Sequence, residues 1–380
     1  MPAKLPYAFL LTAMRPFFHL LVAIALVTSL LACHKQDDTT PAAPTPVPPL
    51  TFTVTTLAGS TKSGYADGTG SAALFENTND LTVDQQGNLY VTDYSNHRIR
   101  KVTPAGVVTT LAGSGIVGRF DGAGNTAQFD GPAGIAVDAQ GLVYVADTNN
   151  NLIRVITPAG VVSTLTGRAG QGLQDGPVAS AKFFYPNHLA FDQQGNLYVS
   201  ESRNNRIRKI TPQGMVSTLA GGEAGVAAPQ GYADGPASSA RFAGPEGIAV
   251  DRQGNVYVAD VNNNRIRKVT PAGVVSTVAG SGAKDFADGI GTQAKFSYPV
   301  GVVVDANGIL YVTDYVNGCL RRIGTDGQVT VAVGSNKGFG PADGTGPAAQ
   351  FTGPRGLAIS ASGQELYVAD ELRIRKAVGR

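Results

Sequence analysis

One stretch of sequence, Gly247 to Val269, occurs in six copies along this chain and limits the folds that it can adopt. It reads GIAVDRQGNVYVADVNNNRIRKV. The residue that closes its first apolar run recurs as Asp84, Asp138, Asp192, Asp251, Asp305 and, in the last copy, Ser360. The steps between these positions are 54, 54, 59, 54 and 55 residues. A period of this kind indicates an array of one supersecondary unit.

Each copy predicts four short strands, which we call a, b, c and d. In the fourth copy they are GIAVD, NVYVAD, RIRKV and VVSTVAG, and apolar residues alternate with small or polar ones as a strand requires. Strands a and b are joined by turns such as 84–88 (DQQGN), and strands c and d by turns such as 103–106 (TPAG). Gly and Pro in these turns favour tight hairpins. Four-stranded antiparallel units at this period are typical of β-propeller blades.

The connection from strand d to the next strand a is long but regular. It carries an Asp-Gly pair and, eight residues after the Asp, a Phe; these residues are Asp67/Phe75, Asp121/Phe129, Asp175/Phe183, Asp234/Phe242, Asp288/Phe296 and Asp343/Phe351. Because the spacing is fixed, we expect an ordered loop whose Phe wedges between neighbouring blades. Burial of each ring would contribute about 1.5–3 kcal/mol.

The two ends of the array complement each other. The last copy stops at Arg380, soon after strand c, and lacks strand d, whereas residues 51–59 (TFTVTTLAG) match a strand d with no preceding strands. The sequence therefore predicts an all-β, six-bladed propeller over residues 51–380, in which the N-terminal strand completes the sixth blade. Closure of this kind removes the open edges of the array.

The blade signature resembles the NHL repeat family. In the fourth copy, the residues that show this resemblance are Tyr257-Val258-Ala259-Asp260 and Asn263-Asn264-Arg265-Ile266-Arg267-Lys268. The resemblance implies a six-bladed propeller. The family includes RNA-binding modules, sensor ectodomains, and lyases or lactonase-like enzymes, so the fold alone does not choose a function.

Residues 1–32 have the features of a secretory signal. Lys4 and Arg15 precede an apolar run that ends in Leu-Leu-Ala before Cys33. This ending resembles the bacterial lipobox, which implies that Cys33 carries the lipid and that the protein is anchored in the cell envelope, with His34 favouring the outer membrane. An ordinary cleaved signal or an uncleaved anchor is the alternative. Residues 33–50 contain five prolines and predict an extended linker.

Charge excludes one class of partner. Cleavage of residues 1–32 removes Lys4 and Arg15 and no acidic residue, which leaves 28 basic and 28 acidic side chains. A neutral chain has no general attraction for nucleic acid. We therefore expect a protein or glycan partner and no nucleic acid, and we expect the chain to be monomeric.

Residues that recur in nearly every blade are expected to build the scaffold. They are the strand-c arginines (Arg100, Arg154, Arg208, Arg267, Arg321, Arg375) and the strand-b aspartates (Asp93, Asp147, Asp260, Asp314, Asp370). We expect these side chains to pair within or between blades. The repeated Asp-Gly pair is interpreted as an Asx turn, with a calcium ligand as the alternative.

Functional residues are expected where the blades differ. If strand a is innermost, the residues entering it surround the mouth of the central channel, and the b–c and d–a connections share that face. The candidates at the channel mouth are Asn79, Asp80, Asn187, His188, Glu201, Glu246 and Arg355. They would hold a cation or a small polar ligand; the alternative is a polar mouth filled with water. Tyr94, Arg203 and Tyr315 in the b–c loops are candidate partner contacts, because exposed Tyr and Arg favour interfaces.

Two functions follow from these candidates. The first is a non-enzymatic binding or scaffold module. The second is a calcium-dependent hydrolase or lyase with its site at the mouth, in which Asp80, Asn187 and Glu246 hold the metal. A zinc enzyme would need several histidines, and outside the signal segment the chain has only His34, His97 and His188. Cys319 is interpreted as a packing residue.

Overall fold

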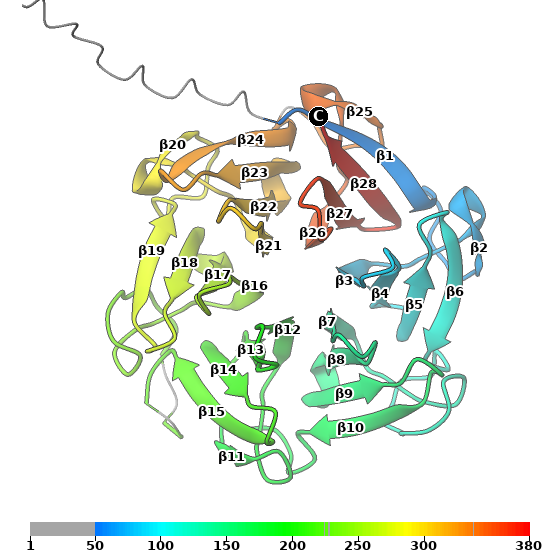
Figure 1. The fold of residues 1–380 in the computed structure, drawn as a ribbon, viewed down its shortest axis with the longest axis vertical. Coiled ribbons are helices and arrows are strands. Elements are labelled where there is room, and N and C mark those ends of the chain that lie inside the picture. Colours follow the sequence, from blue (N-terminus) through cyan, green and yellow to red (C-terminus); the bar gives the residue numbers. More distant parts are fainter. Residues whose placement is uncertain (1–49, 224, 227–228, 337) are drawn as a thin grey trace, which may run out of the picture. The chain divides into compact units, whose positions relative to one another are not determined.

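Six antiparallel sheets surround a central axis (Figure 1). The computed structural model describes residues 50–223, 225–226, 229–336 and 338–380. The predicted signal segment, Cys33 and nearly all of the predicted linker lie outside the described residues. Within the described residues, no helix is long and apolar enough to cross a membrane.

Each blade has the four predicted strands. Blade 1 contains β3 (Thr78–Val83), β4 (Leu89–Asp93), β5 (Arg98–Val102) and β6 (Val107–Ala112). Blade 2 contains β7 (Pro132–Val137), β8 (Val143–Asp147), β9 (Leu152–Ile156) and β10 (Val162–Thr166). Blade 3 contains β12 (Pro186–Phe191), β13 (Leu197–Glu201), β14 (Arg206–Ile210) and β15 (Met215–Ala220). Blade 4 contains β16 (Pro245–Val250), β17 (Val256–Asp260), β18 (Arg265–Val269) and β19 (Val275–Ala279). Blade 5 contains β21 (Pro299–Val304), β22 (Leu310–Asp314), β23 (Cys319–Ile323) and β24 (Gln328–Gly334).

Blade 6 is assembled from both ends of the described chain, as the sequence predicted. It contains β26 (Pro354–Ile359), β27 (Glu365–Asp370), β28 (Arg373–Gly379) and, as its outermost full-length strand, β1 (Phe52–Gly59). β1 runs antiparallel to β28, with Thr53 opposite Val378 and Val54 opposite Ala377. Figure 1 shows β1 and β28 side by side, so the ring is closed by hydrogen bonds between strands.

Short elements in the d–a connections add a fifth strand to four of the sheets. They are β2 (Gly68–Thr69), β11 (Gly176–Pro177), β20 (Gly289–Ile290) and β25 (Gly344–Thr345), each paired with the start of an outermost strand. The 3-10 helices are η1 (Gly70–Ala72), η2 (Thr148–Asn150), η3 (Val261–Asn263), η4 (Gly291–Gln293), η5 (Tyr315–Asn317) and η6 (Gly346–Ala348). The sequence did not predict the fifth strands, because two residues are too few to show a period.

The apolar core lies between the blades. The six loop phenylalanines all have 0% exposure, and each belongs to a cluster shared by two blades. Phe129, for example, packs with Ile99 of blade 1 and Ile135 of blade 2. The predicted wedge is confirmed. Each loop phenylalanine anchors its d–a connection to the interface between the two blades that this connection joins.

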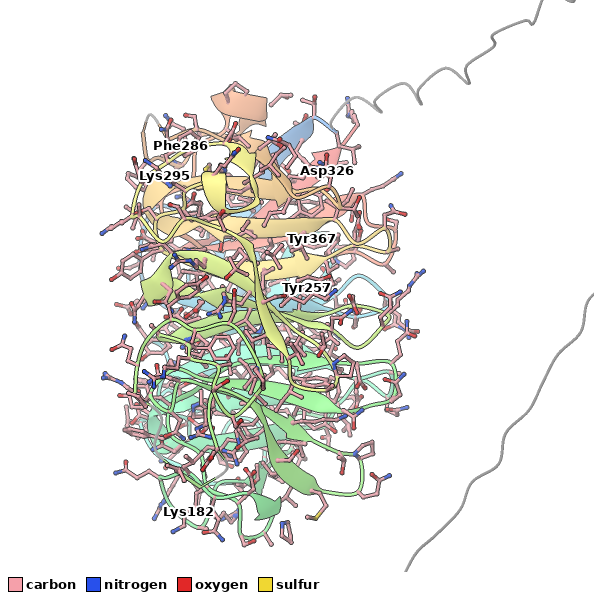
Figure 2. The ribbon with its side chains drawn as sticks, turned by 90° about the vertical axis from the view of Figure 1, so that its left-hand side faces the viewer. Lys182, Tyr257, Phe286, Lys295, Asp326 and Tyr367 are labelled. Carbon is pink, nitrogen blue, oxygen red and sulfur yellow. The ribbon has the colours of Figure 1, made fainter. Side chains whose placement is uncertain are left out.

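The propeller has two distinct faces. Seen edge-on, Phe286 of a d–a connection lies to one side and Asp326 of a c–d turn to the other (Figure 2). The b–c and d–a connections form the first side, which we call the loop face. The a–b and c–d hairpin turns form the opposite side.

Candidate functional site

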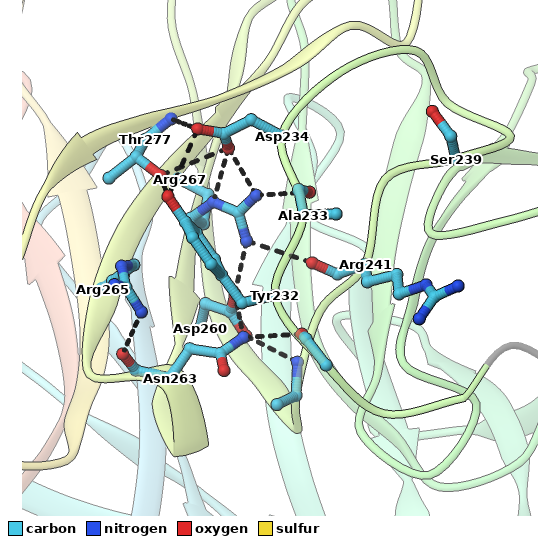
Figure 3. A network of polar contacts seen from close by, with 12 residues as sticks. Tyr232, Ala233, Asp234, Ser239, Arg241, Asp260, Asn263, Arg265, Arg267 and Thr277 are labelled. Carbon is cyan, nitrogen blue, oxygen red and sulfur yellow. Dashed lines mark hydrogen bonds and ion pairs between the residues drawn. The ribbon is translucent and has the colours of Figure 1, made fainter.

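The repeated arginines and aspartates form buried ion pairs inside each blade. The strand-c arginine is fully buried and contacts the strand-b carboxylate across the hairpin at 2.6–3.0 Å, as in Arg267–Asp260 at 2.6 Å. Its second nitrogen contacts the loop aspartate, as in Arg267–Asp234 at 2.5 Å (Figure 3). A buried guanidinium requires partners of this kind. These residues therefore build the scaffold, as the sequence predicted.

Two interpretations of individual residues are corrected by these pairs. Glu201, predicted at the channel mouth, is fully buried and takes the place of the strand-b aspartate, contacting Arg208 at 2.8 Å. The Asp-Gly loop carboxylates also have another role than an Asx turn. Asp234 accepts hydrogen bonds from Arg267 and from the backbone N–H and hydroxyl of Thr277, which lies 43 residues later.

Close packing of the innermost strands explains why most residues at the mouth are glycine. The six equivalent positions are Asp80, Gly134, His188, Gly247, Gly301 and Gly356. A Cβ on any of the four glycines would lie 2.2–2.4 Å from the backbone of the next blade. Only glycine permits this approach. The two interfaces without it, between blades 1 and 2 and between blades 3 and 4, have Asp80 and His188 instead.

Asp80 and His188 each reach toward the following blade and also contact each other. Asp80 Oδ2 accepts a hydrogen bond from the Ile135 N–H at 3.0 Å, and His188 Nδ1 accepts one from the Ile248 N–H at 3.4 Å. His188 Nε2 lies 3.1 Å from Asp80 Oδ2. Because Nδ1 accepts a hydrogen bond, Nε2 carries a proton, and this proton is on the side of the ring that faces Asp80.

The pair leaves one buried oxygen without a partner. The side chain of Asp80 is 2% exposed, and its Oδ1 has no hydrogen-bond partner among the described residues. A buried polar atom without a partner costs about 1–3 kcal/mol, so Asp80 is retained at this position at a cost to stability.

Glu246 and Arg355 add charge to the same level of the channel. Removal from bulk water raises the pKa of Glu246, against the opposing influence of the positive charges of Arg355 and His188. Arg355 stacks over the ring of Tyr315 at 4.7 Å, and its Nε has no partner among the described residues. Asn79 and Asn187 are half-buried, one residue before Asp80 and His188. The structure thus brings together Asp80, His188, Glu246 and Arg355 of the predicted mouth residues.

A cavity of 270 Å³ lies below the mouth on the channel axis. It is lined by three consecutive residues from each innermost strand, from Leu81–Val83 of β3 to Leu357–Ile359 of β26, and His188 borders it. The charged layer therefore stands between this cavity and the loop face.

The predicted calcium ligands do not form a suitable cage. Within the described residues, no three His, Cys, Asp or Glu side chains lie close enough together to hold a metal ion. Asp80 Oδ2 is already occupied by His188 and the Ile135 N–H. Calcium takes six to eight oxygen ligands, which is more than Asp80, Asn187 and Glu246 supply by themselves.

Aromatic residues surround the mouth on the loop face. Of the predicted contacts, Arg203 is exposed and stacks over Tyr185 at 5.1 Å, while Tyr94 and Tyr315 are half-buried. Sequence reasoning missed Tyr185 and Tyr298, which have φ values of 53° and 57°. Three of the other blades have Gly131, Gly244 and Gly353 at this position, and blade 1 has Asn77, with a φ of 56°. A tyrosine in a glycine position was the signal that could have revealed them.

Raised affinity of Glu246 for its proton predicts a pH-dependent stability. The pKa of Glu246 is higher in the folded protein than in the unfolded chain, so the folded state binds this proton more tightly. The contribution of Glu246 to the free energy of unfolding is therefore fully present in acid and is lost as the pH rises through the raised pKa. Glu246→Gln should therefore melt at a higher temperature than the wild type at pH 8 and at the same temperature at pH 4, measured by calorimetry. Glu365→Gln is the matched control with the opposite sign, because hydrogen bonds from Lys376 and Tyr367 lower the pKa of Glu365. A wild type that is more stable than Glu246→Gln at pH 8 would contradict the assignment.

Comparison with solved structures supports the class of protein that the fold defines, a six-bladed β-propeller. A Bacteroides thetaiotaomicron protein of unknown function aligns over 87% of this chain and 76% of its own, with 21% identity and a TM-score of 0.67. An auxiliary nutrient binding protein from Bacteroides ovatus aligns over 87% and 77%, with 18% identity and a TM-score of 0.64. A gluconolactonase from Xanthomonas campestris aligns over 88% and 99%, with 16% identity and a TM-score of 0.55. At these identities the likeness concerns the fold alone.

Four of the repeats match a known repeat family. The model of the NHL repeat matches residues 79–102, 129–156, 242–269 and 296–323. This chain therefore carries NHL repeats within its six-bladed propeller. Curated relatives include the chloroplastic SUPPRESSOR OF QUENCHING 1 of Arabidopsis thaliana, 26% identical over 70% of this chain, and the bovine NHL repeat-containing protein 2, 29% identical over 76%. The alignments span 27% and 44% of those proteins, so less than half of either relative is represented here.

Proposed function

We propose that this chain is a non-enzymatic binding module that takes a protein or glycan partner at the channel mouth and is held at the cell envelope by lipid on Cys33. One observation carries the binding role. Asp80, His188, Glu246 and Arg355 gather at the mouth, where the other four blades have glycine at the positions of Asp80 and His188. Among the described residues, no ion pair engages the guanidinium of Arg355. The repeated charges of the blades, in contrast, are paired internally.

The chemistry around the mouth favours a glycan. Sugars present hydroxyl groups that pair with a carboxylate and a guanidinium, and their apolar faces stack on aromatic rings. Tyr298 is 39% exposed, and Tyr185 and Tyr315 carry arginines over their rings. Rigid aromatic anchors beside convergent polar groups are a common arrangement of binding sites.

The similar structures include both binding proteins and enzymes, so they do not choose between the two candidates. The nutrient-binding neighbour shows that this fold is used for capture, and the gluconolactonase neighbour shows that it is also used by an enzyme. The calcium-dependent alternative has less support, because Asp80 Oδ2 is already engaged by His188 and the Ile135 N–H. A hydrolase or lyase is therefore the second candidate and not the conclusion.

A binding assay tests the proposal. The full-length protein, solubilised in detergent, should bind a subset of glycans on an array, and Arg355→Gln should lower the signal at least about tenfold. Asp326→Asn, on the opposite face, is the matched control and should leave binding unchanged. Failure of every glycan together with capture of a protein from envelope extracts would assign the mouth to a protein. Equal binding by Arg355→Gln would remove the mouth from the proposal.

The anchor is tested separately. Radioactive palmitate should label the wild type and not Cys33→Ser, and the variant should leave the membrane fraction. Label that persists in Cys33→Ser would contradict the proposed attachment, without affecting the binding role.

A further inference from the structure

In five blades the outer edge of the sheet is capped by the loop aspartate. Its carboxylate accepts the backbone N–H of a threonine on the outermost strand at 2.9–3.1 Å, in the pairs Asp67–Thr110, Asp121–Thr164, Asp175–Thr218, Asp234–Thr277 and Asp343–Thr56. Figure 3 shows the cap of blade 4. An N–H that is bound in this way is not available to another strand.

Blade 5 departs from this arrangement. Val331 stands opposite Arg321 in the same register in which Thr277 stands opposite Arg267, so the hydroxyl of the cap is missing. Asp288 contacts Arg321 Nη2 at 2.7 Å, and no hydrogen bond joins it to β24 among the described residues.

A second residue has changed together with Val331. In blades 1 and 4 a tyrosine hydroxyl bonds the cap threonine, in Tyr65–Thr110 at 2.9 Å and Tyr232–Thr277 at 3.0 Å. Blade 5 has Phe286 at this position, and Phe286 keeps the stacking on Arg321 at 4.6 Å. The ring is retained while both hydroxyls are lost, which converts a polar pair into an apolar one.

An apolar groove results on the outer edge of blade 5. It has a volume of 290 Å³ and is lined chiefly by Phe286, Val331, Ala332, Val333 and Pro347. The short strand β20 pairs only with Gln328 and Val329, so β24 continues past it without a further strand on that side. Phe286 lies on the loop-face side of blade 5 in Figure 2.

Charge at the groove indicates the kind of partner. The Asp288 side chain is 49% exposed, and Arg321 is its one ion-pair partner among the described residues. In the other blades the second carboxylate oxygen accepts the threonine N–H, but the second oxygen of Asp288 makes no bond to β24 among the described residues. A basic side chain of a partner therefore interacts favourably with this oxygen. Apolar side chains of the partner fit the groove, and backbone N–H and C=O groups of the partner can pair with the uncapped edge of β24.

We infer that the outer edge of β24 binds an extended peptide segment of a partner protein, in which apolar residues alternate with Lys or Arg. The segment adds as a strand beside Val331–Val333, places apolar side chains against Phe286 and Pro347, and sets a basic side chain at Asp288. Strand addition of this kind derives affinity from main-chain hydrogen bonds and specificity from alternate side chains. It is independent of ligand binding at the channel mouth.

The test uses a fluorescein-labelled Lys-Val-Lys-Val-Lys-Val peptide and the full-length protein. We expect saturable binding with one site per chain. The double variant Phe286→Tyr/Val331→Thr rebuilds the polar pair of blades 1 and 4 and should lower the affinity at least about tenfold. This variant should fold, because the other five blades carry the threonine.

Two further variants sharpen the assignment. The mirror change in blade 1, Tyr65→Phe/Thr110→Val, should raise the stoichiometry from one site to two. Asp288→Asn should weaken binding of the lysine peptide and leave binding of a Ser-Val-Ser-Val-Ser-Val peptide unchanged.

Several results would overturn the inference. They are no binding by the wild type, equal binding by Phe286→Tyr/Val331→Thr, and equal binding of a peptide with Pro at its third and fourth positions. Self-association of the wild type that disappears in the double variant, measured by sedimentation, would assign the groove to a second copy of this chain instead.

Discussion

Removal of residues 51–58 should abolish the single cooperative unfolding transition of the propeller. β1 pairs with seven residues of β28, and its Phe52 and Val54 are buried in a cluster with Tyr311 and Leu320 of blade 5. The deletion would expose the edge of β28 and empty part of this core. Loss of two buried apolar side chains costs about 4–8 kcal/mol, which is comparable to the total stability of a domain.

Calorimetry and near-ultraviolet circular dichroism of the deletion variant check this result. Deletion of residues 36–45, in the predicted linker, is the matched control and should leave the transition unchanged. A synthetic peptide of residues 50–59 should restore part of the transition when added to the truncated chain. Unchanged melting after the deletion would mean that the ring does not need its hydrogen-bonded closure.

Loss of one buried carboxylate should destabilise the propeller by about 3–5 kcal/mol, because it leaves a fully buried guanidinium without its partner. Asp260→Ala is the clearest case, since Asp260 contacts Arg267 at 2.6 Å and both side chains have 0% exposure. Urea unfolding should show a lower midpoint. The ion pair between Arg267 and Asp234 remains in this variant. The side chain of Asp234 is 39% exposed, however, so its charge does not replace the buried charge of Asp260.

Two controls separate the ion pair from other effects of this substitution. Asp326→Ala, on an exposed c–d turn, should change stability by no more than about 0.5 kcal/mol. Asp260→Leu/Arg267→Met removes both charges and should recover most of the loss, since an apolar replacement of a buried pair is often neutral. Equal destabilisation by the single and double variants would show that packing, and not charge, accounts for the effect.

Much of the fold could be predicted because the same pattern of strands and turns occurs six times in the sequence. The alternation in 247–250 and 256–260 placed strands a and b, and the fixed spacing to Phe242 placed the wedge between blades. The unmatched segment 51–59 predicted the closing strand. These features depend on local pattern and on counting, which a single sequence displays.

The partners of polar side chains were harder to predict. Asp234 bonds Thr277, 43 residues away, so its role could not be inferred from the Asp-Gly pair. Glu201 was interpreted as a difference between blades, although it is a longer carboxylate at a scaffold position and reaches the same arginine nitrogen. Asp80 and His188 could be recognised as departures from the repeat, because the other four blades need glycine there for a strict steric reason.

Closure by β1 has a consequence for how the chain is made. β1 (Phe52–Gly59) precedes its partner β28 (Arg373–Gly379) in the chain by five complete blades. Until β28 has been synthesised, the segment FTVTTLAG has strong strand propensity and lacks the strand that it pairs with in the ring. It is therefore exposed to non-native strand pairing until the ring closes.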